Sequence, residues 1–278
     1  MMSSTRKLFL SLVSFSVVPL MLAACTETSL DSATAPEQSS SSLEAASGAL
    51  PQGNDRVALD PKDFATKIDN PYFPLERGTR WTYLETDEKG HELKVVVVVT
   101  RKTEKMANGI TARVVRDTVT QDGEVLEDTN DWYAQDTKGN VWYMGEDTAE
   151  FENGKISSRD GSFEAGVDGA MPGIIMPALP EAGVSYKQEY YKGQAEDNGE
   201  ILSTTEMADV PFGHFEDMVL EKNTITIEPD VLEYKLYAKD VGMVLALGIS
   251  GGGGREELVN VDHAPASAGT GPLGNPNP

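Results

Sequence analysis

The chain has 278 residues and a formal net charge of −22, with 45 acidic against 23 basic side chains. Nucleic acids and anionic membrane surfaces are bound through clustered Lys and Arg, so this composition argues against both as partners of the folded part. The single cysteine cannot form an intramolecular disulfide, and roughly 210 residues between two polar ends are enough for one domain with its own core.

The first 24 residues have the features of a secretory signal peptide. Arg6 and Lys7 precede a short apolar run that ends at Ala23 and Ala24, directly before Cys25. A basic start, a short apolar core and small residues before the cleavage site are typical of such a signal. A membrane-spanning helix would need roughly 20 apolar residues, so it is the weaker interpretation.

The stretch L-A-A-C at 22–25 resembles the lipobox of bacterial lipoproteins. The resemblance implies that Cys25 becomes the N-terminus and carries a thioether-linked diacylglycerol, usually with a further acyl chain such as palmitate on its amine. Stable anchoring generally takes more than one such chain. Thr26 in place of Asp favours, by analogy, the outer membrane of a diderm bacterium. The alternative is a free thiol at Cys25 in an ordinary signal peptide.

Both ends of the mature chain are predicted to be disordered. Residues 25–55 are rich in Ser, Ala, Glu and Pro and bury too little apolar surface to fold, so they form a tether that spans on the order of 30 Å. Residues 264–278 are rich in Gly and Pro. The folded domain is therefore expected over residues 56–263, on a lipid-anchored tether in the cell envelope.

The domain is predicted to start with one short helix. Asp60 is suited to the N-cap, Pro61 to the first turn and Asp63 to the third helical position. This helix is expected to end near 68–70, before Pro71.

After this helix the pattern indicates strands. Turn signals such as N-G and D-G recur between short runs of β-prone residues, and no long 3.6-residue period is present. We expect a mainly β fold, either a single antiparallel curved sheet (half-barrel) or a closed up-and-down barrel. The apolar run 95–99 predicts a strand covered on both faces. The expected strands are 79–86, 92–103, 110–121, 124–135, 141–151, 184–191, 201–209, 215–227, 232–238, 242–249 and 256–261.

A second resemblance covers most of residues 60–262. The stretch 70–83 follows the pattern N-P-Y-F-P-L-x-x-G-T-x-W-x-Y, which is similar to the opening of a group of uncharacterised bacterial lipoproteins. Further similar runs lie at 131–136, 139–143, 172–177, 211–215 and 237–242. The resemblance implies one domain and no established chemistry. The predicted architecture is also similar to that of secreted lipid-carrier half-barrels.

Four aromatic residues form the first candidate ligand site. A four-residue loop at 136–139 would place Trp132 opposite Tyr143 and Tyr133 opposite Trp142, which gives each sheet face one aromatic pair. One pair fills the core, and the other could stack on a sugar or another flat ligand. The alternative is that the second pair lies under a loop.

That loop, 164–183, is the second candidate. Three prolines argue against regular structure, yet Met171, Ile174, Ile175 and Met176 are apolar. We expect a plug over one barrel end; a ligand-gating or membrane-dipping role is the alternative. A small molecule, lipid or sugar would then bind between this loop and the aromatic hairpin.

Asp117 is a candidate for a carboxylate buried inside the barrel. Asp117 shares a strand face with Val115 and Val119, and inside the barrel it would need Arg113, Arg116 or a tyrosine as partner.

Carboxylates on neighbouring strands could also act together. Asp117, Asp128 and Asp131 could serve as paired carboxylates of a hydrolase. Asp128, Asp131, Glu146 and Asp147 could bind calcium in a stability or adhesion module, although no D-x-[DN]-x-[DN]-G loop is present. Solvated surface acids are the plain alternative.

No nucleophile or nucleotide motif points to an enzyme. The chain lacks G-x-S-x-G, H-E-x-x-H and a phosphate-binding glycine loop. His91, His214 and His263 lie in turns or near the tail, and a general-base role for His214 is the weaker interpretation. We therefore expect a non-enzymatic, lipid-anchored envelope protein, with no predicted cofactor, that binds a small ligand or has a structural role at the surface.

Overall fold

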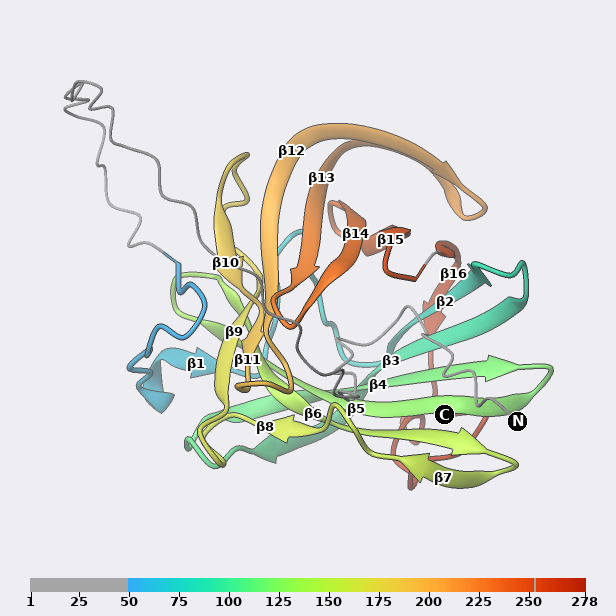
Figure 1. Cartoon of the computed structure of the whole chain (residues 1–278), viewed down its shortest axis with the longest axis horizontal. Coiled ribbons are helices and arrows are strands. Elements are labelled where there is room, and N and C mark those ends of the chain that lie inside the picture. The colour runs from blue at the N-terminus through green and yellow to red at the C-terminus, as the bar shows by residue number, and fades with distance from the viewer. Residues whose placement is uncertain (1–49, 253) are drawn as a thin grey trace, which may run out of the picture.

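The computed structural model describes residues 50–252 and 254–278. The predicted signal peptide, Cys25 and most of the tether lie outside the described residues. The described part is mainly β and contains no helix long and apolar enough to cross a membrane. The predicted fold class, one curved antiparallel sheet, is confirmed (Figure 1).

The sheet contains long strands joined mostly by tight hairpins. After a 3₁₀ turn (η1, Pro61–Asp63), the strands are β1 (Phe64–Ala65), β2 (Thr79–Asp87), β3 (Glu92–Lys105), β4 (Thr111–Gln121), β5 (Glu124–Asp136), β6 (Val141–Glu152), β7 (Lys155–Ser158), β8 (Phe163–Glu164), β9 (Met171–Met176), β10 (Ser185–Lys187), β11 (Glu189–Tyr190), β12 (Asp197–Val210), β13 (Gly213–Ile225), β14 (Glu228–Ala238), β15 (Gly242–Ser250) and β16 (Gly254–His263).

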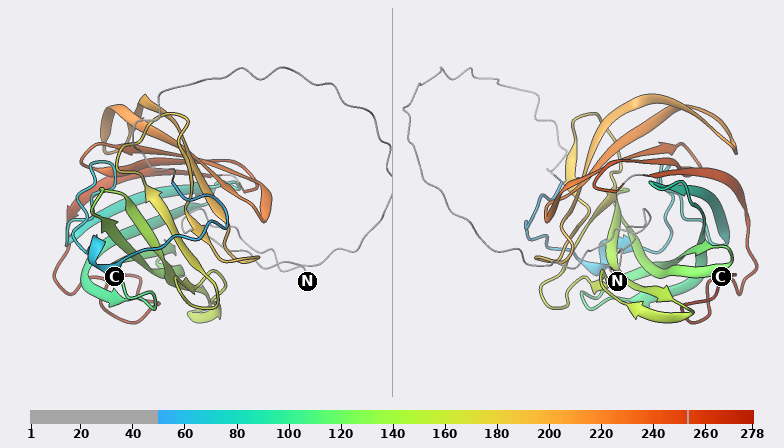
Figure 2. Two further views of the ribbon diagram at one scale, coloured as in Figure 1. Left: turned by 90° about the vertical axis from the view of Figure 1, so that its left-hand side faces the viewer. Right: turned by 45° about the vertical axis from the view of Figure 1, so that its right-hand side comes forward.

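The two ends of the sheet lie next to each other in the chain. The strand order is β10-β12-β13-β14-β15-β16-β2-β3-β4-β5-β6-β9-β11, with β1, β7 and β8 attached to β5 and β6. Only Gln188 separates β10, which pairs with β12, from β11, which pairs with β9. The stretch 185–190 therefore joins both ends, and the sheet is nearly closed into a barrel. Figure 2 shows the strands curving around a common interior.

A glycine allows this near-closure. A Cβ atom on Gly173 of β9 would lie 2.4 Å from the carbonyl carbon and oxygen of Gln188 and from the carbonyl oxygen of Lys187. These are backbone atoms, which cannot rotate away as a flexible side chain could. Only a residue without a side chain lets β9 and the 185–190 stretch approach so closely.

The apolar run in β3 is covered on both faces, as predicted. Val95 and Val99 belong to the main core inside the barrel. Val96 and Val98 point outward and pack against Ala264 and the partly buried Ala268.

Residues 264–278, expected to be disordered, lie instead against the outside of the sheet, and we call them the C-terminal strap. Ala264 is buried, and the Ala264 N–H donates to Gly78 O at 2.8 Å. Further along, the backbone of Gly271, Pro272 and Gly274 bonds to side chains of β4 and β5. Composition alone is a poor guide here, because small residues and prolines also suit an extended segment that gains its stability from the surface beneath it.

The segment before β2 also differs from its prediction. Asp60 caps η1 as expected, since its side chain accepts a hydrogen bond from the Lys62 N–H at 3.0 Å, but the turn ends at Asp63. The chain then becomes extended and pairs with the end of β5, with Phe64 opposite Asp136. Tertiary pairing with β5 replaces the helical hydrogen bonds that local propensity favours.

The folded part also begins before residue 56. The Lys187 N–H donates to Pro51 O at 2.7 Å, so the chain is already held against β10 at that point.

The stretch 164–183 is not an irregular plug. Residues Met171–Met176 form β9, a wall strand between β6 and β11. Pro172 is accommodated because it lies outside the residues of β9 that pair with β6 and is opposite only Glu189 of the two-residue strand β11.

Candidate functional site

A cavity of about 130 Å³ in which aromatic and ionisable side chains meet is the candidate site. It lies between the segment that precedes β2 and residues of β2–β5, β9, β14 and β15. Its lining combines aromatic, aliphatic and ionisable side chains: Phe73, Pro74, Leu75, Trp81, Tyr83, Val97, Asp117, Asp131, Tyr133, Ile175, Lys235, Tyr237, Gly242 and Met243.

The N-P-Y-F-P-L segment covers this cavity. The buried Asn70 side chain donates to Gly139 O at 3.1 Å and to Pro177 O at 3.0 Å, and accepts from the Tyr72 N–H at 3.0 Å. These bonds tie the segment to the β5–β6 turn and to the end of β9. The following residues, 73–75, are thereby placed over the barrel interior.

Aromatic rings form one wall. Phe73 lies 5.4 Å from Tyr133 and 6.3 Å from Tyr237 between ring centroids. Trp81 Nε1 donates to Val241 O at 2.9 Å, and the Tyr83 hydroxyl donates to Met243 O at 3.1 Å. Because the polar edges of Trp81 and Tyr83 are occupied by backbone carbonyls, their apolar ring surfaces remain for the cavity.

Two carboxyl groups form the other wall. Asp117 of β4 and Asp131 of β5 lie on the inner face, where Asp117 is opposite Thr129 and Asp131 is opposite Val115. The predicted placement of Asp117 with Val115 and Val119 is thus confirmed. Asp117 Oδ1 is buried without a hydrogen-bond partner among the described residues.

Neither arginine that was expected to pair with Asp117 does so. The Arg113 guanidinium donates to Thr66 O and Lys102 O instead. Arg116 points to the opposite face of the sheet, where it meets Asp128.

The environment of both cavity acids favours their protonated forms. Burial, followed by repulsion from Asp131 and Glu127, raises the pKa of Asp117 well above its usual value. Burial also raises the pKa of Asp131, to about 7, although the Tyr143 hydroxyl, which donates to Asp131 Oδ1 at 2.8 Å, acts in the opposite direction. The same hydroxyl lies 3.0 Å from Glu146 Oε2. The single hydroxyl proton of Tyr143 cannot hydrogen-bond fully to both Asp131 and Glu146. Protonation of one of these two carboxyl groups is therefore favourable.

The acidic character continues through the barrel interior. Burial raises the carboxyl pKa of further inward-facing residues: Glu146, Glu189, Asp197, Glu221 and Glu256. Repulsion from neighbouring carboxylates adds to this effect for all of them except Glu221. Lys235 brings a positive charge to the cavity and pairs with Glu233 at 3.0 Å. Burial lowers the pKa of Lys235, but Glu233 and Glu221 more than offset this, so its net pKa is raised.

Only two of the eight proposed ligand-binding residues line the cavity, namely Tyr133 and Ile175. The prediction of a mouth between residues 171–179 and the aromatic hairpin is wrong, because β9 pairs directly with β6 as its neighbour in the wall. Trp142 points outward, where Phe64 covers it at 6.1 Å between ring centroids and Asp136 accepts from its Nε1 at 2.9 Å. The second aromatic surface is therefore covered, as the alternative interpretation held, but by β1.

The cross-strand partners of the hairpin also differ from the prediction. Tyr133 lies opposite Tyr143, and Ala134 lies opposite Trp142. The Asp136 N–H donates to Asn140 O at 3.0 Å, so the connecting loop has three residues instead of four and the register moves by one. Both tyrosines consequently point inward, with 5.1 Å between their ring centroids.

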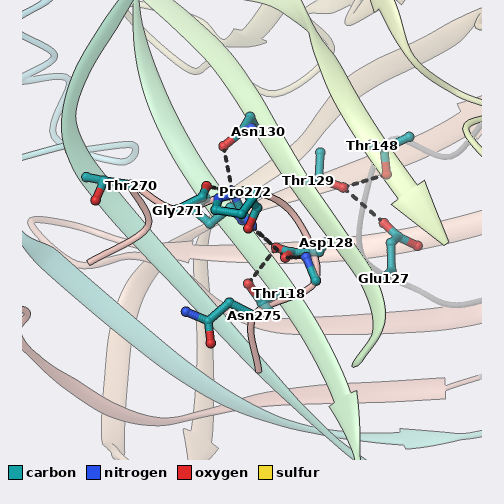
Figure 3. A network of polar contacts seen from close by, with 12 residues as sticks. Thr118, Glu127, Asp128, Thr129, Asn130, Thr148, Thr270, Gly271, Pro272 and Asn275 are labelled. Atoms are coloured by element: carbon teal, nitrogen blue, oxygen red, sulfur yellow. Dashed lines mark hydrogen bonds and ion pairs between the residues drawn. The ribbon is translucent and has the colours of Figure 1, made fainter. Parts of the chain in front are cut away.

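Asp128 belongs to the opposite, outer face. It forms a two-pronged ion pair with Arg116, whose Nη2 lies 2.6 Å from Asp128 Oδ2. Thr118 and the backbone N–H of Gly274 also donate to Asp128 (Figure 3). The three-acid hydrolase set is thereby reduced to Asp117 and Asp131.

The four residues of the calcium hypothesis do not meet either. Asp131 lies opposite Glu146 on the inner face, whereas Asp128 and Asp147 face outward. Asp147 pairs with Arg159 at 2.6 Å on the surface. Within residues 50–252 and 254–278, no group of three or more acidic, His or Cys side chains converges in a way that could hold a metal ion.

Several cavity residues were missed by sequence reasoning. Trp81, Tyr83, Tyr237 and Lys235 lie on strands whose pairing around the barrel brings them together. The alternation of Lys235 and Tyr237 on β14 could have placed both on one face. His214 is exposed, and its Nδ1 lies 2.9 Å from Asp209 Oδ1. It is not among the residues that line the cavity.

No protein-family model matches the chain, and no curated protein matches it in sequence. Two solved structures are similar to part of it. One is a proposed exported protein with a YmcC-like fold from Bacteroides fragilis, with 15% identity, a TM-score of 0.41 and coverage of 70% of this chain and 100% of the other. The second is a proposed lipoprotein from Parabacteroides distasonis, with 13% identity, a TM-score of 0.38 and coverage of 69% and 99%.

Proposed function

We propose that this protein is a lipid-anchored, non-enzymatic binding protein of the cell envelope that holds a small ligand in its barrel interior. The observation that carries the proposal is the cavity of about 130 Å³ with an aromatic wall and a carboxyl wall. Binding sites typically combine a mostly apolar lining with a few converging polar groups, some of them with shifted pKa values.

The anchor is supported by sequence alone. The L-A-A-C stretch ends in Cys25, and residues between it and the barrel are predicted to form a tether. An acidic barrel on such a tether is repelled by anionic headgroups, which favours an orientation away from the membrane surface. Placement in the outer membrane, if the source is a diderm bacterium, belongs to the same proposal.

Binding is favoured over hydrolysis by the state of the two cavity acids. A carboxylate-dependent hydrolase needs one protonated acid and one ionised base or nucleophile. Burial raises the pKa of Asp117 well above its usual value and that of Asp131 to about 7, so Asp131 is the one candidate for the ionised partner and is only about half ionised at pH 7. Asp128, the remaining acid of the hydrolase hypothesis, is fully occupied by Arg116 on the other face.

The test is direct recovery of the ligand. Because the barrel and its core lie within residues 50–278, the chain lacking residues 1–25 retains every described contact. Native mass spectrometry of this protein should show an added small-molecule mass that disappears on unfolding. A mass equal to that of the bare chain, combined with no binding in a screen of small polar and aromatic compounds, would overturn the proposal.

A further inference from the structure

We infer that the cavity is a site for a small organic ammonium ion, a cation surrounded by aromatic faces and backed by carboxyl groups. This inference rests on the proposed function and adds the chemical class of the ligand.

The aromatic wall is suited to a cation. Phe73, Trp81, Tyr83, Tyr133 and Tyr237 all line the same cavity. Aromatic faces carry negative electrostatic potential, and cages of several rings are the usual receptors for substituted ammonium groups. The hydrogen bonds of Trp81 and Tyr83 to backbone carbonyls direct their polar edges away from a ligand.

The carboxyl groups supply a compensating negative charge when a cation binds, because a nearby cation favours their ionised forms. Asp117 and Asp131 line the cavity, and Asp117 Oδ1 has no partner among the described residues. Glu256 is not among the lining residues, but it is only 1% exposed and acts electrostatically on Asp117, and neither of its carboxyl oxygens has a hydrogen-bond partner in the described part of the chain. Buried polar groups are nearly always hydrogen-bonded, so unpartnered carboxyl oxygens at a cavity point to a missing positive partner.

Lys235 does not make the cavity an anion site. Its ammonium group is 3.0 Å from Glu233, and Glu221 and Glu256 also act on it electrostatically. The positive charge of Lys235 is therefore balanced by these glutamates of the protein itself. An anionic ligand would face Asp117 and Asp131 without a free counter-charge.

A bound metal ion fits less well than an organic cation. Calcium requires six to eight oxygen ligands, and the described residues contain no convergent set of three acidic or histidine ligands. The cavity volume of about 130 Å³ is instead close to that of an engineered cavity of roughly 150 Å³ that accepts benzene. A compact ammonium ion with a few methyl groups is of this size class.

The experiment compares three probes of similar shape by isothermal titration calorimetry on the chain lacking residues 1–25. Choline carries the quaternary nitrogen, 3,3-dimethylbutan-1-ol has carbon in its place, and 3,3-dimethylbutanoate is an anion. We expect choline to bind at least about tenfold more tightly than the neutral alcohol, because cation–π contacts and carboxylates act on it alone, and the anion to bind most weakly.

The outcomes separate this inference from the proposed function. Equal binding of choline and the neutral alcohol would leave a ligand-binding cavity but overturn the ammonium assignment. Tighter binding of the anion would also overturn it. Binding of none of the three, together with no ligand recovered by native mass spectrometry, would overturn both.

Variants locate the binding. Asp131→Asn should weaken choline binding by about tenfold while changing binding of the alcohol by less than about twofold, since the substitution preserves shape and removes charge. Asp147→Asn, the same change on the outer face of the neighbouring strand, is the matched control and should change neither.

A second measurement covers the case in which Asp131→Asn fails to fold. Choline binding to the parent protein near pH 7 should release protons, seen as a buffer-dependent enthalpy that the alcohol lacks. A buffer-independent choline enthalpy would count against the inference.

Discussion

Arg116 and Asp128 form a buried ion pair on the outer face of the sheet, and the C-terminal strap completes it. The Arg116 guanidinium also donates to Gly271 O and Pro272 O, and the Gly274 N–H donates to Asp128 Oδ2 at 2.6 Å (Figure 3). Both side chains are at most 1% exposed. The strap thus contributes to the fold itself, by satisfying groups that β4 and β5 leave open.

This pair gives the first prediction. Asp128→Asn leaves Arg116 buried without its counter-charge and should lower the free energy of unfolding by about 3–5 kcal/mol. Asp147→Asn breaks an exposed pair with Arg159 and should cost no more than about 1 kcal/mol. Urea unfolding of both variants checks this. Equal stability of the two would show that the strap does not shield the Arg116–Asp128 pair.

The near-closure of the barrel gives the second prediction. Gly173→Ala places a methyl group against the backbone of Gln188 and should destabilise the protein by about 1–3 kcal/mol or more, because backbone has to move. At Gly213 a Cβ atom would meet nothing within 4 Å, so Gly213→Ala is the matched control and should be nearly neutral. Thermal melts of the two variants measure the difference. A Gly173→Ala variant with the melting temperature of the parent protein would mean that β9 and the 185–190 stretch lie farther apart.

The third prediction concerns Tyr143. Its hydroxyl donates to Asp131 and is the interaction that lowers the pKa of that carboxyl, so Tyr143→Phe should raise the Asp131 pKa above about 7. A carboxyl-detected NMR titration follows the change. Tyr186→Phe removes a hydroxyl bonded to Glu221 and should leave the Asp131 pKa as it is. A lower Asp131 pKa in Tyr143→Phe would contradict the hydrogen-bond assignment.

The fourth prediction is a decrease in stability with rising pH. The pKa of Asp131 and that of Asp197 are raised from 3.8 to about 7 in the folded state, chiefly by burial. The folded protein therefore binds more protons than the unfolded chain between about pH 4 and pH 7. The stabilisation that these two protonated carboxyl groups provide is complete below about pH 4 and is lost as the pH rises through 7. For each group, a pKa difference of one between the folded and unfolded states corresponds to about 1.4 kcal/mol in the free energy of unfolding.

Melting temperatures between about pH 4.5 and 8 should therefore fall with rising pH, and those of Asp131→Asn should fall less steeply because the amide cannot ionise. Repulsion among surface acids acts in the same direction, so the comparison with the variant isolates the buried group. A parallel decline in the variant would assign the whole effect to the surface.

The fifth prediction tests the anchor. Cys25→Ser in the full chain should move the protein from the membrane fraction to the soluble fraction, because a serine hydroxyl cannot form the thioether to the lipid. Metabolic labelling with palmitate should mark the parent protein and not the variant. Ser29→Ala, four residues further along the predicted tether, is the control and should keep both the label and the membrane association. Membrane association of Cys25→Ser equal to that of the parent would contradict the lipid anchor.

Local sequence patterns were sufficient to predict most of the strands. The predicted strands 124–135 and 141–151 agree closely with β5 and β6, because alternation and turn residues act over a few positions. The same rules failed where pairing with a distant segment decided the conformation. Phe64 lies in a strand since β5 is available beside it, and Met171–Met176 forms a strand between β6 and β11 despite Pro172.

The candidate site was predictable only in part. The strand face that Asp117 shares with Val115 and Val119 was predicted correctly, because residue parity along β4 is a local property. The partners of Tyr133 were not, since a loop shorter by one residue moves the whole register. Lys235 of β14 lies more than 100 residues after Asp131 in the chain, and nothing in the sequence around Lys235 indicates that the two line the same cavity.

The antiparallel β fold could be predicted without coordinates, as could the candidate secretion signal and lipobox at Cys25, because each depends on residues that are adjacent or a few positions apart. The three-dimensional arrangement was needed to learn which acids share a cavity, how the strap covers Arg116 and where the barrel nearly closes at Gln188. Those features depend on register and on long-range pairing, in which a shift of one residue exchanges the inside of the barrel for the outside.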